Sequence, residues 1–143
     1  MINKMKSRMK LFGIIAFVST IGFLVTGCLT KKINTSLEGV WDRGDIVVTI
    51  TGNEGVFTKI NPDTNWHKIQ SKDLVKIGDV KFKNITKTEN LKWTAQELSH
   101  DINTLTISGW NNTVITMDPD GKTLHILTGG NVKNPNNSYK RVQ

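Results

Sequence analysis

Apolar and polar side chains alternate with a period of two residues through much of the chain after residue 80. Trp93 and Ala95 alternate with Thr94 and Gln96, and the segment 122–128 repeats the pattern. Because successive side chains of a β-strand point to opposite faces, this period indicates strands with one apolar and one polar face. The domain carries no sustained apolar period of 3.6 residues, so the sequence predicts an all-β domain with an antiparallel sheet.

Turn-forming residues divide this pattern into short segments at intervals of about 8–12 residues. The segment 118–121, Asp-Pro-Asp-Gly, suits a type I turn, and Gly78-Asp79 suits a two-residue hairpin loop. About 105 residues in eight to ten short strands favour a small up-and-down barrel, and a two-sheet β-sandwich is the alternative. For 91–100, a short helix is the alternative to a strand. The predicted strands are 45–51, 55–60, 66–70, 74–77, 80–86, 91–98, 104–109, 113–118, 122–128 and 138–142.

The same alternation predicts which side chains face the interior. Val80 and Phe82 are expected on the apolar inner face of their strand, and Lys81 and Lys83 on its polar outer face. Trp110 is expected beside a turn at 110–112. If the barrel encloses a cavity, the side chains expected to face a ligand are Phe82, Trp93, Leu105, Ile115 and Leu124.

The first 27 residues differ in composition from the rest of the chain. Residues 1–10 hold four basic side chains and no acidic one, and residues 11–23 form an apolar run. A positive segment followed by an apolar core of this length is typical of a secretory signal peptide, which is expected to be helical. A retained transmembrane helix is the alternative, because 11–29 gives 19 residues, close to the roughly 20 that span a bilayer.

A short motif follows the apolar run, Val25-Thr26-Gly27-Cys28. It resembles the lipobox of bacterial lipoproteins, in which an aliphatic residue, a small residue and Gly or Ala precede the cysteine. The resemblance implies cleavage before Cys28 and attachment of acyl chains to its thiol, so that the chain is held to a membrane. Cys28 is the single cysteine of the sequence, and lipid attachment accounts for it without a disulfide.

The expected organisation is a signal peptide at 1–27, a lipidated tether at 28–38 and a barrel domain at 39–143. The tether reaches at most about 35 Å, so the domain is expected close to a membrane of the cell envelope, outside the cytoplasm. By resemblance to known sorting patterns, Leu29 after the cysteine favours the outer membrane in a cell with two membranes. Without residues 1–27 the chain has 15 basic and 12 acidic side chains, a balance that argues against a nucleic-acid partner.

Two segments at opposite ends of the domain carry a second resemblance. Gly39 and Trp41 precede the first long predicted strand, and Arg141 lies in the last one. In lipocalins and related small barrels, a Gly-x-Trp at the first strand closes one end of the barrel and a late Arg packs over the indole. The resemblance implies that Gly39, Trp41 and Arg141 close this barrel. The Thr-Asp-Tyr motif of lipocalins is missing, and the domain is shorter than a typical lipocalin.

The sequence offers no set of residues that points to catalysis. His67, His100 and His125 are separated from one another and lack the spacing of metal ligands, and hydrolase, metalloprotease and phosphate-loop motifs are missing. We therefore expect a non-catalytic, monomeric binding module without metal or cofactor. Two hypotheses remain: a small apolar ligand held inside the barrel, or an envelope protein bound or inhibited through loops such as 129–137.

Overall fold

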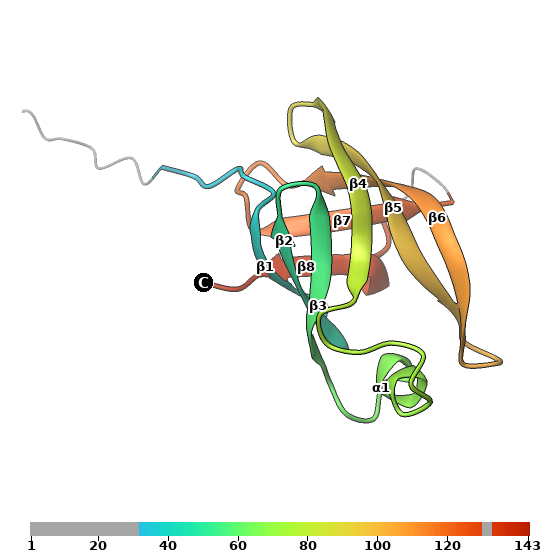
Figure 1. The fold of residues 1–143 in the computed structure, drawn as a ribbon. Helices are drawn as coiled ribbons and strands as arrows, with labels where there is room; N and C mark the ends of the chain where they lie inside the picture. Colours follow the sequence, from blue (N-terminus) through green and yellow to red (C-terminus); the bar gives the residue numbers. More distant parts are fainter. Residues whose placement is uncertain (1–31, 130–132) are drawn as a thin grey trace, which may run out of the picture. The chain divides into compact units, whose positions relative to one another are not determined.

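The computed structural model describes residues 32–129 and 133–143 (Figure 1). The predicted signal helix and the lipobox at residues 25–28 lie outside the described residues. Their assignment therefore stays a prediction, and the fold below concerns the domain alone.

The domain is a closed eight-stranded antiparallel barrel in which each strand pairs with its neighbour in sequence. The last strand pairs with the first through Trp41 and Arg141, which closes the sheet (Figure 1). This order confirms the predicted up-and-down barrel and excludes the two-sheet sandwich. The strands are β1 (Gly39–Asp42), β2 (Ile46–Thr51), β3 (Glu54–Ile60), β4 (Val80–Glu89), β5 (Lys92–Asp101), β6 (Thr106–Met117), β7 (Thr123–Thr128) and β8 (Ser138–Arg141).

The strand predicted at 66–70 is wrong, because these residues lie in the helix α1 (Asn65–Gln70). Thr64 caps the helix: its hydroxyl accepts a hydrogen bond from the His67 backbone N–H at 3.1 Å. Trp66 and Ile69, three residues apart, are both buried. The i, i+3 spacing of these two apolar residues places them on one helical face, a signal that the period-two interpretation missed.

The strand predicted at 74–77 is also wrong, and Gly78-Asp79 therefore does not close a hairpin. The segment 71–79 is a loop that docks on β3 through the backbone: Gly78 N–H donates to Phe57 O at 2.8 Å, and Phe57 N–H donates to Asp79 O at 2.9 Å. This loop and α1 fill the connection between β3 and β4 (Figure 1).

The predicted strands 104–109 and 113–118 merge into β6, the longest strand described. Gly109, with φ of +110°, sits beside a bulge in the pairing of β5 with β6 rather than in a turn. Trp110 is consequently a strand residue and does not stand beside a turn. The prediction of a strand rather than a helix at 91–98 is confirmed by β5.

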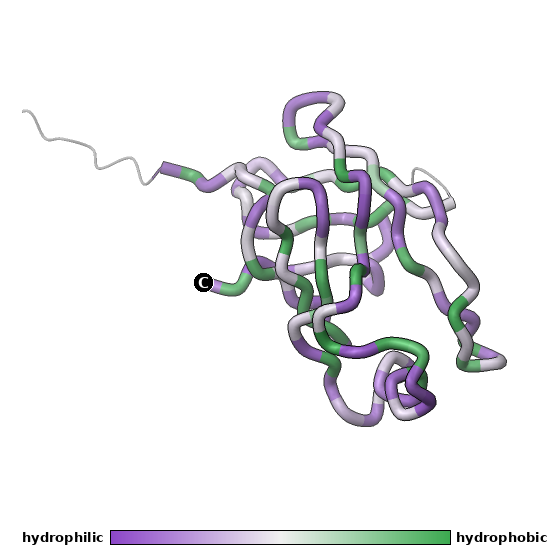
Figure 2. Tube along the Cα trace, viewed as in Figure 1, coloured by the Kyte–Doolittle hydropathy of each residue, from purple (hydrophilic) through white to green (hydrophobic). Residues whose placement is uncertain are grey.

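Alternation places most of the core correctly, and Figure 2 shows the mixture of hydrophobic and hydrophilic residues along the strands. Lys81 is the exception: it was expected on the outer face, yet it is 1% exposed. The pairing of β4 with β5 sets Phe82 opposite Glu97, and Lys81 beside them meets the buried Glu97 carboxylate. A charge can be buried there because its partner is supplied by the neighbouring strand, which a local pattern does not reveal.

Candidate binding groove

The barrel interior holds a charged pair among apolar side chains. Lys81 Nζ donates to Glu97 Oε1 at 2.8 Å, and the second carboxylate oxygen accepts from the Thr128 hydroxyl at 2.6 Å. The ammonium also lies 4.7 Å from the centroid of Trp66. Burial lowers the pKa of Lys81 to about 8, and Glu97 opposes this shift. This part of the interior is therefore occupied by side chains that satisfy one another.

Two buried polar atoms near this pair have no hydrogen-bond partner within the described residues: Trp66 Nε1 and Tyr139 Oη. Burial raises the pKa of Tyr139, with nearby carboxylates adding to the effect and Arg43 opposing it. Arg43 in turn forms a two-point contact with Asp45, at 2.8 and 2.7 Å. The polar cluster thus extends from the ion pair toward one end of the barrel.

The residues predicted to face a ligand occupy the same interior. Four of them are buried in the hydrophobic core. Leu105 was expected in a strand but lies in the turn that joins β5 and β6, where it is partly exposed and packs against the core. The other core side chains around them include Trp41, Phe57 and Ile46, each 0% exposed. The four buried residues, placed together by the fold, are Phe82, Trp93, Ile115 and Leu124.

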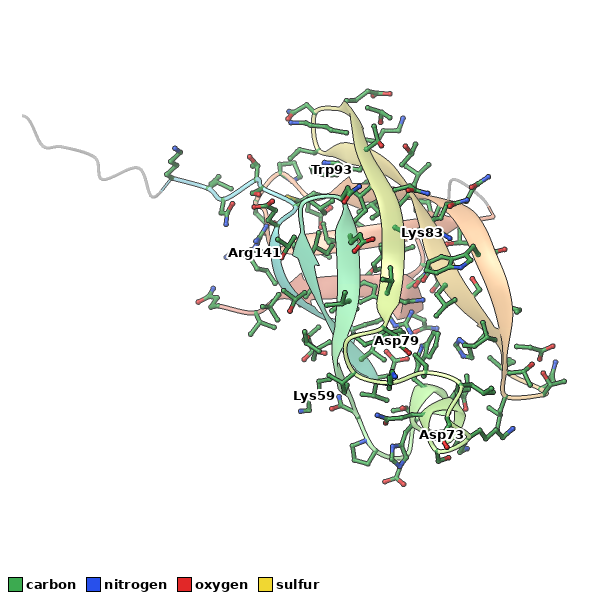
Figure 3. All side chains as sticks on the ribbon, viewed as in Figure 1. Lys59, Asp73, Asp79, Lys83, Trp93 and Arg141 are labelled. Carbon is green, nitrogen blue, oxygen red and sulfur yellow. The ribbon has the colours of Figure 1, made fainter. Side chains whose placement is uncertain are left out.

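The residues predicted to close the barrel come from opposite ends of the domain sequence and lie together in the structure. The Arg141 guanidinium carbon lies 4.1 Å from the centroid of Trp41, and the Trp41 indole N–H donates to Leu37 O at 2.9 Å. Arg141 also donates to the carbonyls of Gly121 and Glu38 at 2.9 and 3.0 Å. Gly39 has a φ of +140°, which L side chains rarely adopt, and a Cβ there would lie 2.7 Å from Arg141 Nη1, so a larger residue would strain the backbone and displace the guanidinium. Figure 3 labels Arg141 beside the first strands.

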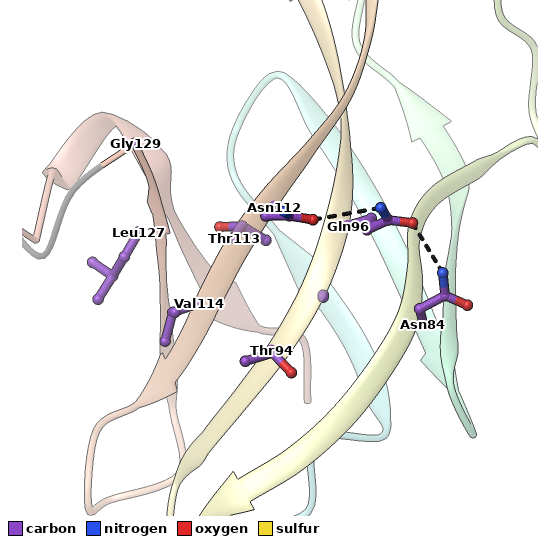
Figure 4. Close-up of a pocket in the computed structure, with 9 residues that line it drawn as sticks. Asn84, Thr94, Gln96, Asn112, Thr113, Val114, Leu127 and Gly129 are labelled. Carbon is purple, nitrogen blue, oxygen red and sulfur yellow. Dashed lines mark hydrogen bonds between the residues drawn. The ribbon is translucent and has the colours of Figure 1, made fainter.

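A groove of about 650 Å³ lies along β4, β5, β6 and β7 (Figure 4). Its side chains include those on the outward positions of these strands, where Thr94 and Gln96 alternate with the buried Trp93 and Ala95. Val114 and Leu127, which are paired across β6 and β7, add an apolar part. Among the described residues, no charged side chain lines it.

Three amide side chains form a ladder across the groove. Asn84 Nδ2 donates to Gln96 Oε1 at 2.9 Å, and Gln96 Nε2 donates to Asn112 Oδ1 at 3.4 Å (Figure 4). Strand register explains the second contact, because Gln96 and Asn112 are direct partners on β5 and β6. The ladder therefore joins three strands whose sequence positions are well separated.

Asn84 reaches the ladder because β4 is irregular at this point. Its φ is +55°, and the pairing of β4 with β5 shifts register between Lys83 and Thr86. Asparagine adopts this left-handed conformation more readily than most residues. The bulge turns the Asn84 amide toward Gln96, so one residue supplies both the unusual backbone and the hydrogen-bonding group.

An exposed aromatic side chain lies on the same outer face as the ladder. Trp110 is 37% exposed and stands two residues before Asn112 on β6. Lys83, which projects from β4 (Figure 3), places its Nζ 3.9 Å from the indole centroid. An ammonium over an indole face is a favourable cation–π contact and orients the ring.

His125 lies between Asp118 and Ser138 on the outer side of β7 and β8, with contacts of 3.0 Å to each. The Ser138 hydroxyl donates to Asn134 O at 3.1 Å. The Ser138 hydroxyl is thus shared between the imidazole and a backbone carbonyl. Asp118 also accepts from Lys133 at 3.2 Å, so this group acts as a surface polar network.

Among residues 32–129 and 133–143, no three His, Cys, Asp or Glu side chains are grouped so that they could hold a metal ion. The same residues include no helix with the length and apolar character needed to cross a bilayer. Comparisons with known protein families, curated proteins and solved structures found no match.

The sequence predicted that Thr94 and Gln96 face outward but not that they line a groove. Asn84 and Asn112 were not predicted as site residues. The available signal was weak: an Asn within a strand pattern, where a bulge is easily accommodated, and polar amides at outward positions of adjacent strands.

Proposed function

We propose that this chain is a lipid-anchored protein of the cell envelope whose barrel is a non-catalytic binding module, and that it binds through the outer groove of β4–β7. The observation that carries the proposal is the groove itself, with about 650 Å³ of space, a ladder of three amides and an exposed indole beside it. Ligand sites are concave, and a few placed polar groups in them fix the orientation of the ligand.

The interior supports binding less well. A small apolar ligand there would displace packed core residues such as Phe57 and Ile115, both 0% exposed. It would also lie against the charged pair of Lys81 and Glu97. Placing an apolar molecule beside two charges that already satisfy each other offers no compensating contact.

The proposed lipid anchor would place the groove near a membrane. Acyl chains on Cys28 would hold the domain by a tether shorter than the extended length of residues 28–38, because Leu37 is buried in the core and Glu38 is bonded by Arg141. The groove would then sample material of the envelope close to the membrane surface. This part of the proposal depends on the lipobox and is tested separately below.

A sedimentation assay tests the use of the groove. The full-length protein in a zwitterionic detergent is mixed with the insoluble envelope fraction of the producing cell, and the bound share is measured after centrifugation. Thr94→Lys introduces a charged, bulky side chain into the groove, and we expect at least about a tenfold loss of affinity. Thr58→Lys is the matched control, because Thr58 is also an exposed strand threonine but lies on β3 outside the groove.

Equal sedimentation of the wild-type protein and both variants would refute the proposed use of the groove. Loss in Thr94→Lys alone supports it. If native mass spectrometry shows a ligand that copurifies with both the wild-type protein and Thr94→Lys, the ligand binds inside the barrel and not in the groove.

A further inference from the structure

The groove has a definite chemical character, which narrows the class of ligand. Its described lining offers amides from Asn84, Gln96 and Asn112 and the hydroxyl of Thr94, without a charged side chain. An ionic ligand would lose hydration on entering this groove and gain no opposite charge in return. The lining therefore fits a neutral ligand that carries many hydrogen-bonding groups.

The amide ladder retains unused hydrogen-bonding capacity. A primary amide has two N–H donors and one carbonyl acceptor. Within the described residues, Asn84 uses one donor toward Gln96, and Gln96 uses one toward Asn112. Both donors of Asn112 and the carbonyl oxygen of Asn84 stand at the two ends of the ladder without a partner there. Adjacent donors and acceptors of this kind match the hydroxyls of a sugar ring, each of which donates and accepts.

Trp110 adds an apolar surface next to these polar groups. The other three tryptophans are 0%, 0% and 7% exposed, whereas Trp110 is 37% exposed. A large exposed aromatic is costly to hydrate, and it gains if it packs against a ligand. The ring carbons of a saccharide present C–H groups to such a surface while their hydroxyls point sideways.

We propose that the groove binds a neutral, hydroxyl-rich saccharide, with the amide ladder bonding its hydroxyls and the exposed part of Trp110 packing on a ring. This inference rests on the proposed function, since it names the ligand class of the same groove. A peptide is the competing occupant. It is disfavoured because the apolar lining is limited to Ala95, Val114 and Leu127 and offers no deep pocket for a side-chain anchor.

Chemical treatment of the envelope fraction tests the ligand class without knowing the ligand. Mild periodate cleaves vicinal diols of saccharides, and proteinase K removes protein. We expect periodate treatment to reduce sedimentation of the full-length protein at least about tenfold, and proteinase K treatment to leave it within about twofold. The opposite pattern would overturn the saccharide and support a protein partner.

Two variants on β6 assign the effect to the ladder. Asn112→Ala removes a ladder amide, and Trp110→Ala removes the indole; each should weaken binding about tenfold or more. Asn111→Ala is the matched control, because the Asn111 side chain bonds Ser99 at 2.9 Å and points to the other side of the strand. If Asn112→Ala binds as tightly as the control Asn111→Ala, the amide ladder does not contribute to binding.

Salt dependence separates a neutral saccharide from an anionic polymer. No charged side chain among the described residues lines the groove, and the Lys83 ammonium beside it is engaged with the Trp110 ring. Binding should therefore change by less than about twofold when salt is raised well above physiological ionic strength. A loss of about tenfold or more would overturn the neutral ligand. If Thr94→Lys weakens binding but periodate treatment does not, the saccharide proposal is wrong and the proposed use of the groove stands. If binding is independent of Thr94, both fail.

Discussion

Removing one member of the buried Lys81–Glu97 pair should destabilise the barrel far more than removing both. The two side chains are 2% and 6% exposed and lie 2.8 Å apart. Truncating one partner of such a pair leaves an uncompensated buried charge, at a cost of about 3–5 kcal/mol. The whole domain has about 5–15 kcal/mol of stability to lose, so Lys81→Met or Glu97→Leu alone should leave it marginal.

The double variant Lys81→Met/Glu97→Leu should recover most of that loss. Two apolar side chains of similar volume replace the charges, a change that is often neutral or stabilising. The hydrogen bond from Thr128 to Glu97 is lost, but the Thr128 hydroxyl keeps Thr113 as a partner at 2.9 Å. We expect the double variant within about 2 kcal/mol of the wild-type protein.

Urea unfolding followed by tryptophan fluorescence measures these differences, and Trp66 is a close reporter because Lys81 Nζ lies 4.7 Å from its ring. Additive losses, with the double variant least stable of all, would refute the reasoning. The double variant is informative even if a single variant fails to fold.

The same pair predicts the direction of a pH effect. Burial lowers the pKa of Lys81 from 10.5 to about 8. Between these pH values the unfolded chain retains this proton more than the folded chain does, so the unfolding free energy should rise with pH. Relative to the double variant Lys81→Met/Glu97→Leu, the expected gain from pH 8 to pH 10 is about 1–3 kcal/mol. A difference that stays flat or falls would contradict the burial of a charged Lys81.

Three further perturbations follow from individual contacts. Arg141→Lys keeps the charge but loses the planar stacking and the paired carbonyl contacts; urea unfolding should show a loss of about 1–2 kcal/mol, against a smaller loss in Lys140→Ala. Tyr139→Phe should be neutral or stabilising by up to about 1 kcal/mol, since the Tyr139 hydroxyl is buried without a partner among the described residues; a clear destabilisation in thermal melts would point to a buried water there. Cys28→Ser should abolish incorporation of labelled palmitate in the producing cell, and label that persists in the variant would contradict lipid attachment at this residue.

The sequence predicted the fold well where one side of a strand is apolar. Trp93 and Ala95 on β5 alternate with polar neighbours, Leu124 on β7 lies between Thr123 and His125, and all three apolar residues are buried. A period of two residues follows directly from strand geometry, so it can be recognised in the sequence without knowledge of tertiary contacts. The helix at 65–70 was missed because the local i, i+3 spacing of Trp66 and Ile69 was not used, whereas the wrong placement of Lys81 has a tertiary cause. Lys81 is polar and buried because Glu97 on the next strand neutralises it.

The candidate site could not be predicted from the sequence. Asn84, Gln96 and Asn112 meet only because strand register and a bulge bring them together. Neither the bulge at Asn84, with its φ of +55°, nor the alignment of β5 with β6 is readable from residue types alone. Local propensity predicts that a strand exists, whereas the alignment of strands depends on the complete sheet.

The location of bound ligand on the barrel is the most direct test of the central claim. Backbone amide NMR spectra of the labelled full-length protein in micelles would be recorded with and without soluble fragments released from the envelope fraction. We predict that shift changes gather at the groove, around Thr94, Gln96 and Asn112. Changes that gather instead at Phe82 and Ile115, with the groove unaffected, would contradict the account and place the ligand inside the barrel.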